Sequence, residues 1–473
     1  MQLSKNALGQ IAAQPRLEIP SAKLLGLPEK VLQFGTGVLL RGLPDYFIDK
    51  ANKQGIFNGR VVIVKSTDSD SSAFDKQDGL YTICVRGVEN GKTIEENIIN
   101  ASVSRVLSAN TEWKRILECA HNLEMKIILS NTTEVGIQLT DDNINDEPPS
   151  SFPGKLLAFL QERFKAFNGS AESGMVIVPT ELITDNGSKV DRIVPGKPNA
   201  EELKRTEETL GYTDELLTNS EVFRLWAIEG NEKIKEVLSF YKADDAVVIT
   251  PDITLFKELR LRLLSGTHSF NCGLAFLSGF NITREAVTDK IFSVFAKNLM
   301  HQEIANSIPF EIDRKVKVEF AINVFERFCN PFIDHQWISI TVQYTSKMKM
   351  RNVPLITRHY ELNENPPMHM ATGFAGFLLF MKATKAENGK YFGERNGKTY
   401  EIKDDSAEYF FNAWKDKSAA DVAKEVMQDE ELWGTDLTAF PGFLSAVQEQ
   451  LQDMMTNGVL NTIAQLETNK VTA

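Results

Sequence analysis

The sequence predicts an α/β domain built on a parallel sheet, followed by a mostly α-helical domain. In the first half of the chain, short apolar runs typical of buried parallel strands alternate with helical patterns. After about Pro251 the longer helical patterns dominate. At 473 residues the chain is also too long for one ordinary domain. We therefore expect one domain at residues 1–255 and a second at residues 256–473.

Each expected element follows from its apolar period. The strands expected in the first half are Lys30–Phe34, Arg60–Lys65, Tyr81–Val85, Lys126–Leu129, Met175–Val178 and Ala246–Thr250. The helices expected there are Val38–Lys50, Trp113–His121 and Pro153–Phe167. The helices expected in the second half are Leu255–Leu277, Arg284–Ser307, Asn363–Ala386, Asp421–Gln428 and Gly442–Ala464.

Composition excludes several classes of function. A net charge of −12 repels the phosphate backbone, so we expect no nucleic-acid partner. Six histidines without HxxxH or HxH spacing predict that no metal is bound. The four cysteines form no CxxC pair, and we expect reduced thiols. Without a signal-peptide pattern or an apolar run of ~18 residues, we expect a cytoplasmic protein that does not bind membranes.

A glycine-rich turn follows the first expected strand. Gly35-Thr36-Gly37 lies between that strand and a helix, which is the arrangement a dinucleotide needs at its pyrophosphate. The third glycine position of this motif is Leu40, so a plain strand–helix turn is the alternative interpretation. Arg41 either pairs with phosphate or lies on the helix surface. With this turn, the fold class becomes an α/β N-terminal, Rossmann-like NAD(P)-binding domain followed by a mostly α-helical C-terminal domain.

Polar residues follow two other expected strands. Asn131, Thr132 and Thr133 stand at a carboxyl end, where open α/β sheets bind ligands; a helix cap or turn is the alternative. After the second strand, Lys65 favours NADP and Asp68 favours NAD, so the cofactor is NAD(H) with NADP(H) still open.

Several blocks in family order resemble the long-chain mannitol dehydrogenase family, which comprises polyol-specific dehydrogenases and reductases. They are LQFGTGVLLR (32–41), QDGLYT (77–82), SNTTEVG (130–136), PTELI (179–183), VDRIVP (190–195), SGTH (265–268), RFCNPFIDH (327–335) and GERNGKTY (393–400). The last block is most similar to the branch that reduces tagaturonate. The resemblance implies reversible, metal-free hydride transfer between NAD(H) and an open-chain sugar acid or polyol.

The resemblance also implies a catalytic helix, but this chain departs from the pattern. The family has Lys, four residues, Asn, two residues, His, whereas this chain has Arg260, Ser265 and His268. Arginine keeps its proton, so it is a poor general base, although it can donate hydrogen bonds to a developing alkoxide. The alternative is an ordinary amphipathic helix with exposed Lys257, Arg260 and Arg262.

Substrate-side positions of the family match a further set of residues. They are Glu181, Arg192, Arg327, Asn330, His335 and Lys347. Arg327 suits a carboxylate because its guanidinium is a planar two-pronged donor; a surface ion pair is the alternative. Asp191 is expected to orient nicotinamide or a substrate hydroxyl, or to pair with Arg192 structurally.

Only Thr184–Lys189 separates the PTELI and VDRIVP blocks, where the family usually has a few tens of residues. Either this chain has lost a helical excursion, or residues are missing from the sequence. Tagaturonate reduction to altronate is the leading expectation, and a fructuronate, mannitol or arabinitol enzyme is the runner-up. A cofactor-binding protein with impaired catalysis is the alternative of another class. We expect a monomer or small homo-oligomer.

Overall fold

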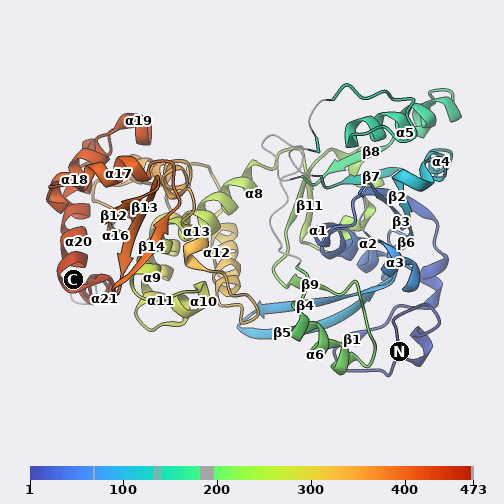
Figure 1. Cartoon of the computed structure of the whole chain (residues 1–473), viewed down its shortest axis with the longest axis horizontal. Helices are drawn as coiled ribbons and strands as arrows, with labels where there is room; N and C mark the ends of the chain where they lie inside the picture. The colour runs from blue at the N-terminus through green and yellow to red at the C-terminus, as the bar shows by residue number, and fades with distance from the viewer. Residues whose placement is uncertain (68–69, 133–135, 138–139, 182–195, 470–473) are drawn as a thin grey trace. The chain divides into compact units, whose positions relative to one another are not determined.

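The computed structural model describes the whole chain except residues 68–69, 133–135, 138–139, 182–195 and 470–473 (Figure 1). The chain forms two compact units, Met1–Ile253 and Thr254–Ala473. The division falls at the start of helix α8 (Thr254–Leu259), next to the expected boundary at residue 255.

A five-stranded parallel sheet forms the centre of the first unit. Its strands, in spatial order, are β6 (Val103–Ser108), β3 (Arg60–Lys65), β2 (Glu29–Phe34), β7 (Ile127–Ser130) and β8 (Val176–Pro179). From β2 the chain adds β3 and β6 on one side, and then returns to add β7 and β8 on the other side. The position between β2 and β7 is therefore the topological switch point, where open α/β sheets bind their ligands. The four strands expected for this sheet are confirmed, and β6 was missed.

Alternating side chains of the sheet enter two separate cores. Val61 and Ile63 of β3 face one core, whereas Val62 and Val64 face the other. Both faces are therefore buried, which explains why these strands read as continuous apolar runs. Phe47 closes the first core, and Trp113 and Phe159 close the second. They belong to α2 (Pro44–Lys53), α4 (Ala109–Cys119) and α5 (Phe152–Ala166) respectively, drawn beside the sheet in Figure 1.

Two expected strands pair outside the central sheet. A four-stranded sheet has the order β1 (Leu17–Glu18), β5 (Lys92–Asn100), β4 (Tyr81–Glu89), β9 (Thr218–Glu221). The strand expected at Ala246–Thr250 is β11 (Val247–Thr250), which pairs in parallel with β10 (Trp226–Glu229). Strands β1, β5, β9 and β10 were not expected, because none of them has a strong apolar period of its own.

The prediction of a single helix at Val38–Lys50 is wrong. The structure has α1 (Val38–Gly42) and then α2, which begins at Pro44. Leu43 has φ −123° and ψ −78°, outside the helical region. A proline disfavours the α conformation in the residue before it, so the break at Leu43 has a local cause.

The second unit is mostly helical, as expected. Helix α8 continues through a π-helical segment η5 (Arg260–Gly266) into α9 (Thr267–Leu277). Helix α16 (Met368–Phe380) packs against α9 at glycine positions: a Cβ at Gly273 would lie 2.9 Å from the carbonyl oxygen of Gly376. Further helices are α10 (Thr283–Thr288), α11 (Phe292–Asn298), η6 (Leu299–Ile304), α12 (Arg314–Phe328), α18 (Ala419–Met427), α20 (Phe443–Asn457) and α21 (Val459–Asn469).

A three-stranded meander replaces the end of the helix expected at Asn363–Ala386. Its strands are β12 (Lys385–Glu387), β13 (Lys390–Arg395) and β14 (Lys398–Ile402). The two turns are Asn-Gly pairs at 388–389 and 396–397, all four residues with positive φ, which favours tight hairpins. The second turn lies inside the GERNGKTY block, so part of that block's pattern is turn chemistry.

The same block fastens the meander to the helices. The Arg395 guanidinium donates to the Phe276 carbonyl oxygen at 3.0 Å and lies 4.1 Å from the centre of the Phe276 ring. The Tyr400 hydroxyl donates to the Phe380 carbonyl oxygen at 2.7 Å. These contacts give Arg395 and Tyr400 a structural role.

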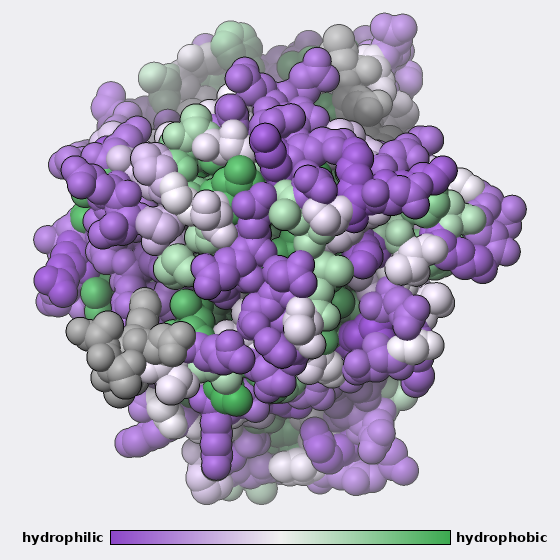
Figure 2. Space-filling model, turned by 90° about the vertical axis from the view of Figure 1, so that its left-hand side faces the viewer, coloured by the Kyte–Doolittle hydropathy of each residue, from purple (hydrophilic) through white to green (hydrophobic). Residues whose placement is uncertain are grey.

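The visible face of the second unit in Figure 2 is mainly hydrophilic, with hydrophobic side chains scattered in small groups. Of the helices in the described part of the chain, none combines the length and the apolar character needed to cross a bilayer.

A buried polar network lies beside the glycine turn of the first unit. The Asp45 carboxylate is fully buried and accepts from Gln33 Nε2 at 3.3 Å and from the Tyr81 hydroxyl at 3.1 Å. Gln33 Nε2 also donates to the Gly35 carbonyl oxygen at 3.3 Å. Burial raises the pKa of Asp45 to about 7, although its two hydrogen bonds and Arg41 act in the opposite direction.

We predict that Asp45→Asn removes a loss of stability at high pH. Because the folded-state pKa is raised, stability is fully present below about pH 4 and is lost as the pH rises through about 7. Between pH 5 and 8 the wild type should lose roughly 3 kcal/mol relative to the variant. Urea unfolding at both pH values measures this, and a difference that does not change with pH contradicts the prediction.

Candidate functional site

The glycine turn lies where three parallel strands end together. The Gly35 amide donates to the Val64 carbonyl oxygen at 3.0 Å, and the Asn131 amide donates to the Phe34 carbonyl oxygen at 3.2 Å. Gly35 has φ +127°, a conformation that L side chains rarely adopt. Gly37 is exposed, and a Cβ there would meet nothing within 4 Å. The space above Gly37 is therefore open for a ligand.

Leu40, at the third glycine position, is buried under the turn. A Cβ on Gly35 would lie 3.0 Å from Leu40 Cδ1, so this side chain packs directly against the turn. The incomplete glycine motif therefore reflects a leucine that supports the turn from within the protein, and it does not obstruct the open side at Gly37.

Arg41 does not lie on the helix surface. Its side chain is buried, its Nη1 donates to the Leu216 carbonyl oxygen, and its guanidinium lies over the rings of Phe74 and Tyr81 at 5.9 and 5.5 Å. Burial lowers the pKa of Arg41. The expected surface position is thus wrong, and the contacts give Arg41 a structural role with no support for phosphate binding.

The other cofactor-side residues gather at the ends of β7 and β8. The Thr132 amide donates to Glu181 Oε1 at 3.2 Å. Glu181 is fully buried, so the structure places this residue, expected on the substrate side, beside the cofactor candidates Asn131 and Thr132. Thr133, Asp191 and Arg192 lie outside the described residues.

In the second unit, the expected catalytic helix changes from α-helical to π-helical hydrogen bonding where the Arg260, Ser265 and His268 motif begins. Arg260 and Ser265 lie in the π-helical segment η5, and His268 lies at the start of α9. A π-helix bonds each residue to the fifth one before it, so side chains follow a different face from an α-helix. A single α-helical face therefore does not run from Lys257 to His268 through this segment. Arg262, which the alternative interpretation places on an exposed helix face, is buried and pairs with Glu258 at 2.9 Å.

His268 sits in an aromatic enclosure. Its ring stacks on Phe328 at 4.3 Å and meets His335 and Trp337 edge-on at 5.4 and 6.0 Å. Its Nε2 is buried without a hydrogen-bond partner in the described part of the chain. Burial lowers the pKa of His268 well below its ordinary value, and the nearby His335 and three cations, Arg327, Arg351 and Lys347, lower it further. His268 is therefore neutral near pH 7, able to hydrogen-bond a ligand.

Arg351 belongs to this group of cations, and sequence reasoning missed it. It lies in η7 (Met348–Asn352), four residues after Lys347 at the end of α14 (Tyr344–Lys347). Its Nη1 donates to Ser269 Oγ at 3.2 Å, and Ser269 Oγ donates to the Ser265 carbonyl oxygen at 3.0 Å. The four-residue spacing from Lys347 is the only sequence signal that pointed to it.

The backbone around Arg351 is fixed to η5. Arg262 Nη1 donates to the carbonyl oxygens of Met350 and Arg351, both at 2.8 Å. Asn352 Nδ2 donates to the Gly266 carbonyl oxygen at 3.0 Å. Arg351 Nε is buried and makes no hydrogen bond, and within the described residues Arg351 has no ion pair. Burial lowers the pKa of Arg351, and nearby Arg260 acts in the same direction.

The remaining substrate-side candidates have mixed positions. Asn330 is buried, and its Oδ1 accepts from the Phe332 amide at 3.0 Å, which is a turn contact. His335 is exposed at the rim of the His268 enclosure, and Arg327 lies on the last turn of α12. Lys347 is half-buried and donates to the Ile340 carbonyl oxygen at 2.9 Å.

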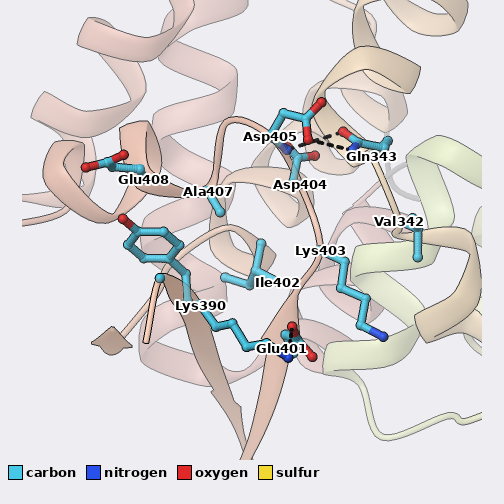
Figure 3. A pocket seen from close by; sticks show the side chains of 12 residues that line it. Val342, Gln343, Lys390, Glu401, Ile402, Lys403, Asp404, Asp405, Ala407 and Glu408 are labelled. Atoms are coloured by element: carbon cyan, nitrogen blue, oxygen red, sulfur yellow. Dashed lines mark hydrogen bonds and ion pairs between the residues drawn. The ribbon is translucent and has the colours of Figure 1, made fainter. Parts of the chain in front are cut away.

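The described residues contain no group of His, Cys, Asp or Glu that could hold a metal ion. A hollow of about 490 Å³ lies between β13, β14 and the segment before α14 (Figure 3). Lys390 and Glu401 pair at its edge at 3.0 Å, and Gln343 donates to Asp405 at 2.8 Å. None of the candidate site residues lines this hollow.

The parallel sheet with an open glycine turn at its switch point defines a dinucleotide-binding oxidoreductase fold. The chain matches the Mannitol dehydrogenase Rossmann domain over residues 29–190 and the Mannitol dehydrogenase C-terminal domain over residues 252–455. It therefore belongs to the mannitol dehydrogenase family, oxidoreductases that act on CH–OH groups.

Similar proteins cover nearly the whole chain. An altronate oxidoreductase of Halalkalibacterium halodurans is 30% identical over 504 aligned residues, covering 98% of this chain and 97% of that protein. One of Pectobacterium carotovorum is 32% identical, covering 91% of this chain and 96% of that protein. The solved Pseudomonas fluorescens mannitol 2-dehydrogenase, in a ternary complex with NAD and D-mannitol, is 20% identical, with a TM-score of 0.65, and covers 99% of this chain and 100% of that one. A D-sorbitol dehydrogenase is 18% identical, with a TM-score of 0.76, covering 98% and 100%.

We predict that Gly37→Val weakens cofactor binding without unfolding the protein. The fold leaves open space at this Cβ, so the side chain should interfere with the pyrophosphate and not with the protein. Calorimetry with NADH should show at least a tenfold higher Kd, with an unchanged thermal midpoint. Gly26→Val is the control, because its Cβ also meets open space at an ordinary φ but lies at the end of η2 (Ala22–Gly26), away from the turn. Equal affinity in wild type and Gly37→Val would refute the assignment.

Proposed function

We propose that this chain is an NAD(H)-dependent reductase of a keto-uronate, converting tagaturonate to altronate. The observation that carries the proposal is the group of cations around neutral His268. Lys347 and Arg351 make no ion pair within the described residues, and an unpaired, partly buried cation is costly. A substrate carboxylate would relieve that cost.

The relatives support the same substrate class. Altronate oxidoreductase is the name of several relatives at about 30% identity over nearly the full length. NAD is the cofactor in the solved mannitol 2-dehydrogenase complex, which favours NAD(H) here, while NADP(H) stays open. We further propose a cytoplasmic enzyme.

In this proposal the two units contribute different parts of the chemistry. Gly35 and Gly37 hold the pyrophosphate, and Asn131 and Thr132 border the same edge. When bound, the nicotinamide supplies or accepts the hydride. Arg327 and Arg351 bind the substrate's negative charge, and His268 hydrogen-bonds a hydroxyl through its unpaired Nε2. Arg260 and Ser265 donate to the oxygen on which charge develops.

Two alternatives remain to be tested against this proposal. A neutral ketose enzyme of the same family would have no use for the unpaired cations. A cofactor-binding protein with impaired catalysis is motivated by Arg260 and Ser265, which stand where the family has Lys and Asn. A panel of keto-uronates and neutral ketoses, followed by NADH absorbance, separates the three. If NADH binds without turnover, the double change Arg260→Lys and Ser265→Asn should create turnover.

We predict that Arg351→Leu selectively impairs reduction of charged substrates. Loss of a desolvated charge pair should cost about 2–4 kcal/mol in kcat/KM for a keto-uronate, mainly as a raised KM. The effect on a neutral ketose should be much smaller. Arg327→Leu should behave similarly if it shares the carboxylate.

Arg358→Leu is the matched control, because Arg358 pairs with Glu361 on α15 (Val353–Leu362), outside the cation group. Equal losses on charged and neutral substrates would show that Arg351 has only a structural role.

A further inference from the structure

Reduction of a ketone requires a proton as well as a hydride, and the catalytic helix offers no good source of it. Arg260 occupies the position of the family's lysine, and a guanidinium does not release its proton at physiological pH. His268 has a lowered pKa and is already neutral near pH 7, so it carries no imidazolium proton to donate. The donor must therefore be another group near this helix.

Lys347 has the surroundings of such a group. Its ammonium has three protons, and one of them goes to the Ile340 carbonyl oxygen at 2.9 Å. Within the described residues, no carboxylate forms an ion pair with Lys347. Its side chain is half-buried, and it lies near enough to His268 to act on that ring electrostatically.

The charged and titratable groups around Lys347 come from three elements. Arg351 of η7 repels its charge, and Cys272 of α9 is a neutral thiol because burial raises its pKa to about 12. Asp404 follows β14, and its two carboxylate oxygens accept hydrogen bonds from the backbone amides of Thr345 at 2.7 Å and Ser406 at 2.9 Å. Burial lowers the pKa of Lys347 and Arg351 adds to this, whereas Cys272 and Asp404 act in the opposite direction without outweighing burial.

We propose that Lys347 donates the proton to the substrate oxygen, the task that the family's pattern gives to the lysine replaced by Arg260. This inference rests on the proposed reductase function. A hydride with its electron pair passes from the reduced nicotinamide to the carbonyl carbon, and the C=O π pair moves onto oxygen. An O–H bond forms as an N–H bond of Lys347 breaks, and the resulting amine regains a proton from water.

Such a donor works best when its pKa approaches the working pH, which is why a half-buried lysine suits the step and an arginine does not. Arg351 has two effects here: it disfavours the ammonium of Lys347, and it remains charged as the oxygen gains electron density. The four-residue spacing of Lys347 and Arg351 places both on adjoining turns of the α14–η7 segment.

The test compares Lys347→Met and Lys347→Arg with wild type and with the control Lys349→Met. Lys349 is exposed, lies on the same segment and donates to the Glu431 carbonyl oxygen. We expect kcat to fall about 10²–10⁴-fold in both Lys347 variants. NADH affinity and the thermal midpoint should not change, and Lys349→Met should behave as wild type. Added methylamine should restore part of the activity of Lys347→Met.

Lys347→Arg separates proton transfer from charge. It keeps the positive charge, so near-normal kcat in this variant would overturn the proposal and leave Lys347 as a carboxylate contact. A change in KM alone would do the same, as would an unchanged pH profile of kcat. Should Lys347→Met fail to fold, the pH profile of Lys347→Arg decides the question.

Failure of the proposed function gives a different result. If wild type reduces a neutral ketose faster than any keto-uronate, the substrate proposal is wrong, and the Lys347 variants are compared on that ketose. If wild type reduces nothing in the panel, both proposals are overturned.

Discussion

The pairing of β2 between β3 and β7 is the constraint on which the cofactor side depends. Parallel pairing aligns Phe34 with Val64 on one side and with Ser130 on the other, so three carboxyl ends meet at one edge. The amides of Gly35 and Asn131 continue this ladder past the strand ends. A one-residue slip would exchange the side chains of the two cores, so the same apolar alternation that stabilises the sheet also fixes the position of the turn.

In the second unit, the comparable constraint is the contact between two π-helical segments. Arg262 and Asn352 join η5 to η7 through three backbone carbonyls. Their bonds hold the backbone at Arg351 in place, four residues after Lys347, and burial disfavours the charges of both residues. Packing in the rest of the unit offsets that cost, notably the close α9–α16 contact that Gly273 and Gly376 permit. The unpaired cations therefore lower the stability of the folded protein, and binding of an anion at this site would raise it.

Much of the fold could be predicted from the sequence, because its signals are local. The strands β2, β3, β7 and β8 read as continuous apolar runs since both sheet faces are covered. Two further features also have local signals. Pro44 marks the helix break at Leu43, and two Asn-Gly turns mark the meander at residues 385–402. Both were overlooked because the apolar period of each segment continues across them. Strands such as β9 (Thr218–Glu221) carry no apolar period, because backbone pairing with β4 defines them.

The sequence by itself determined the two-domain order, the glycine turn and the family motif with its changes at Arg260 and Ser265. Those features depend on residue type and spacing alone. Only the tertiary structure decided that Arg41 is buried, that Glu181 belongs beside Thr132, and that His268 is neutral. It also brought Lys347 and Arg351 to the motif. The physical reason is that burial and the charges of residues distant in sequence set a side chain's protonation and partners, and neither is written in local spacing.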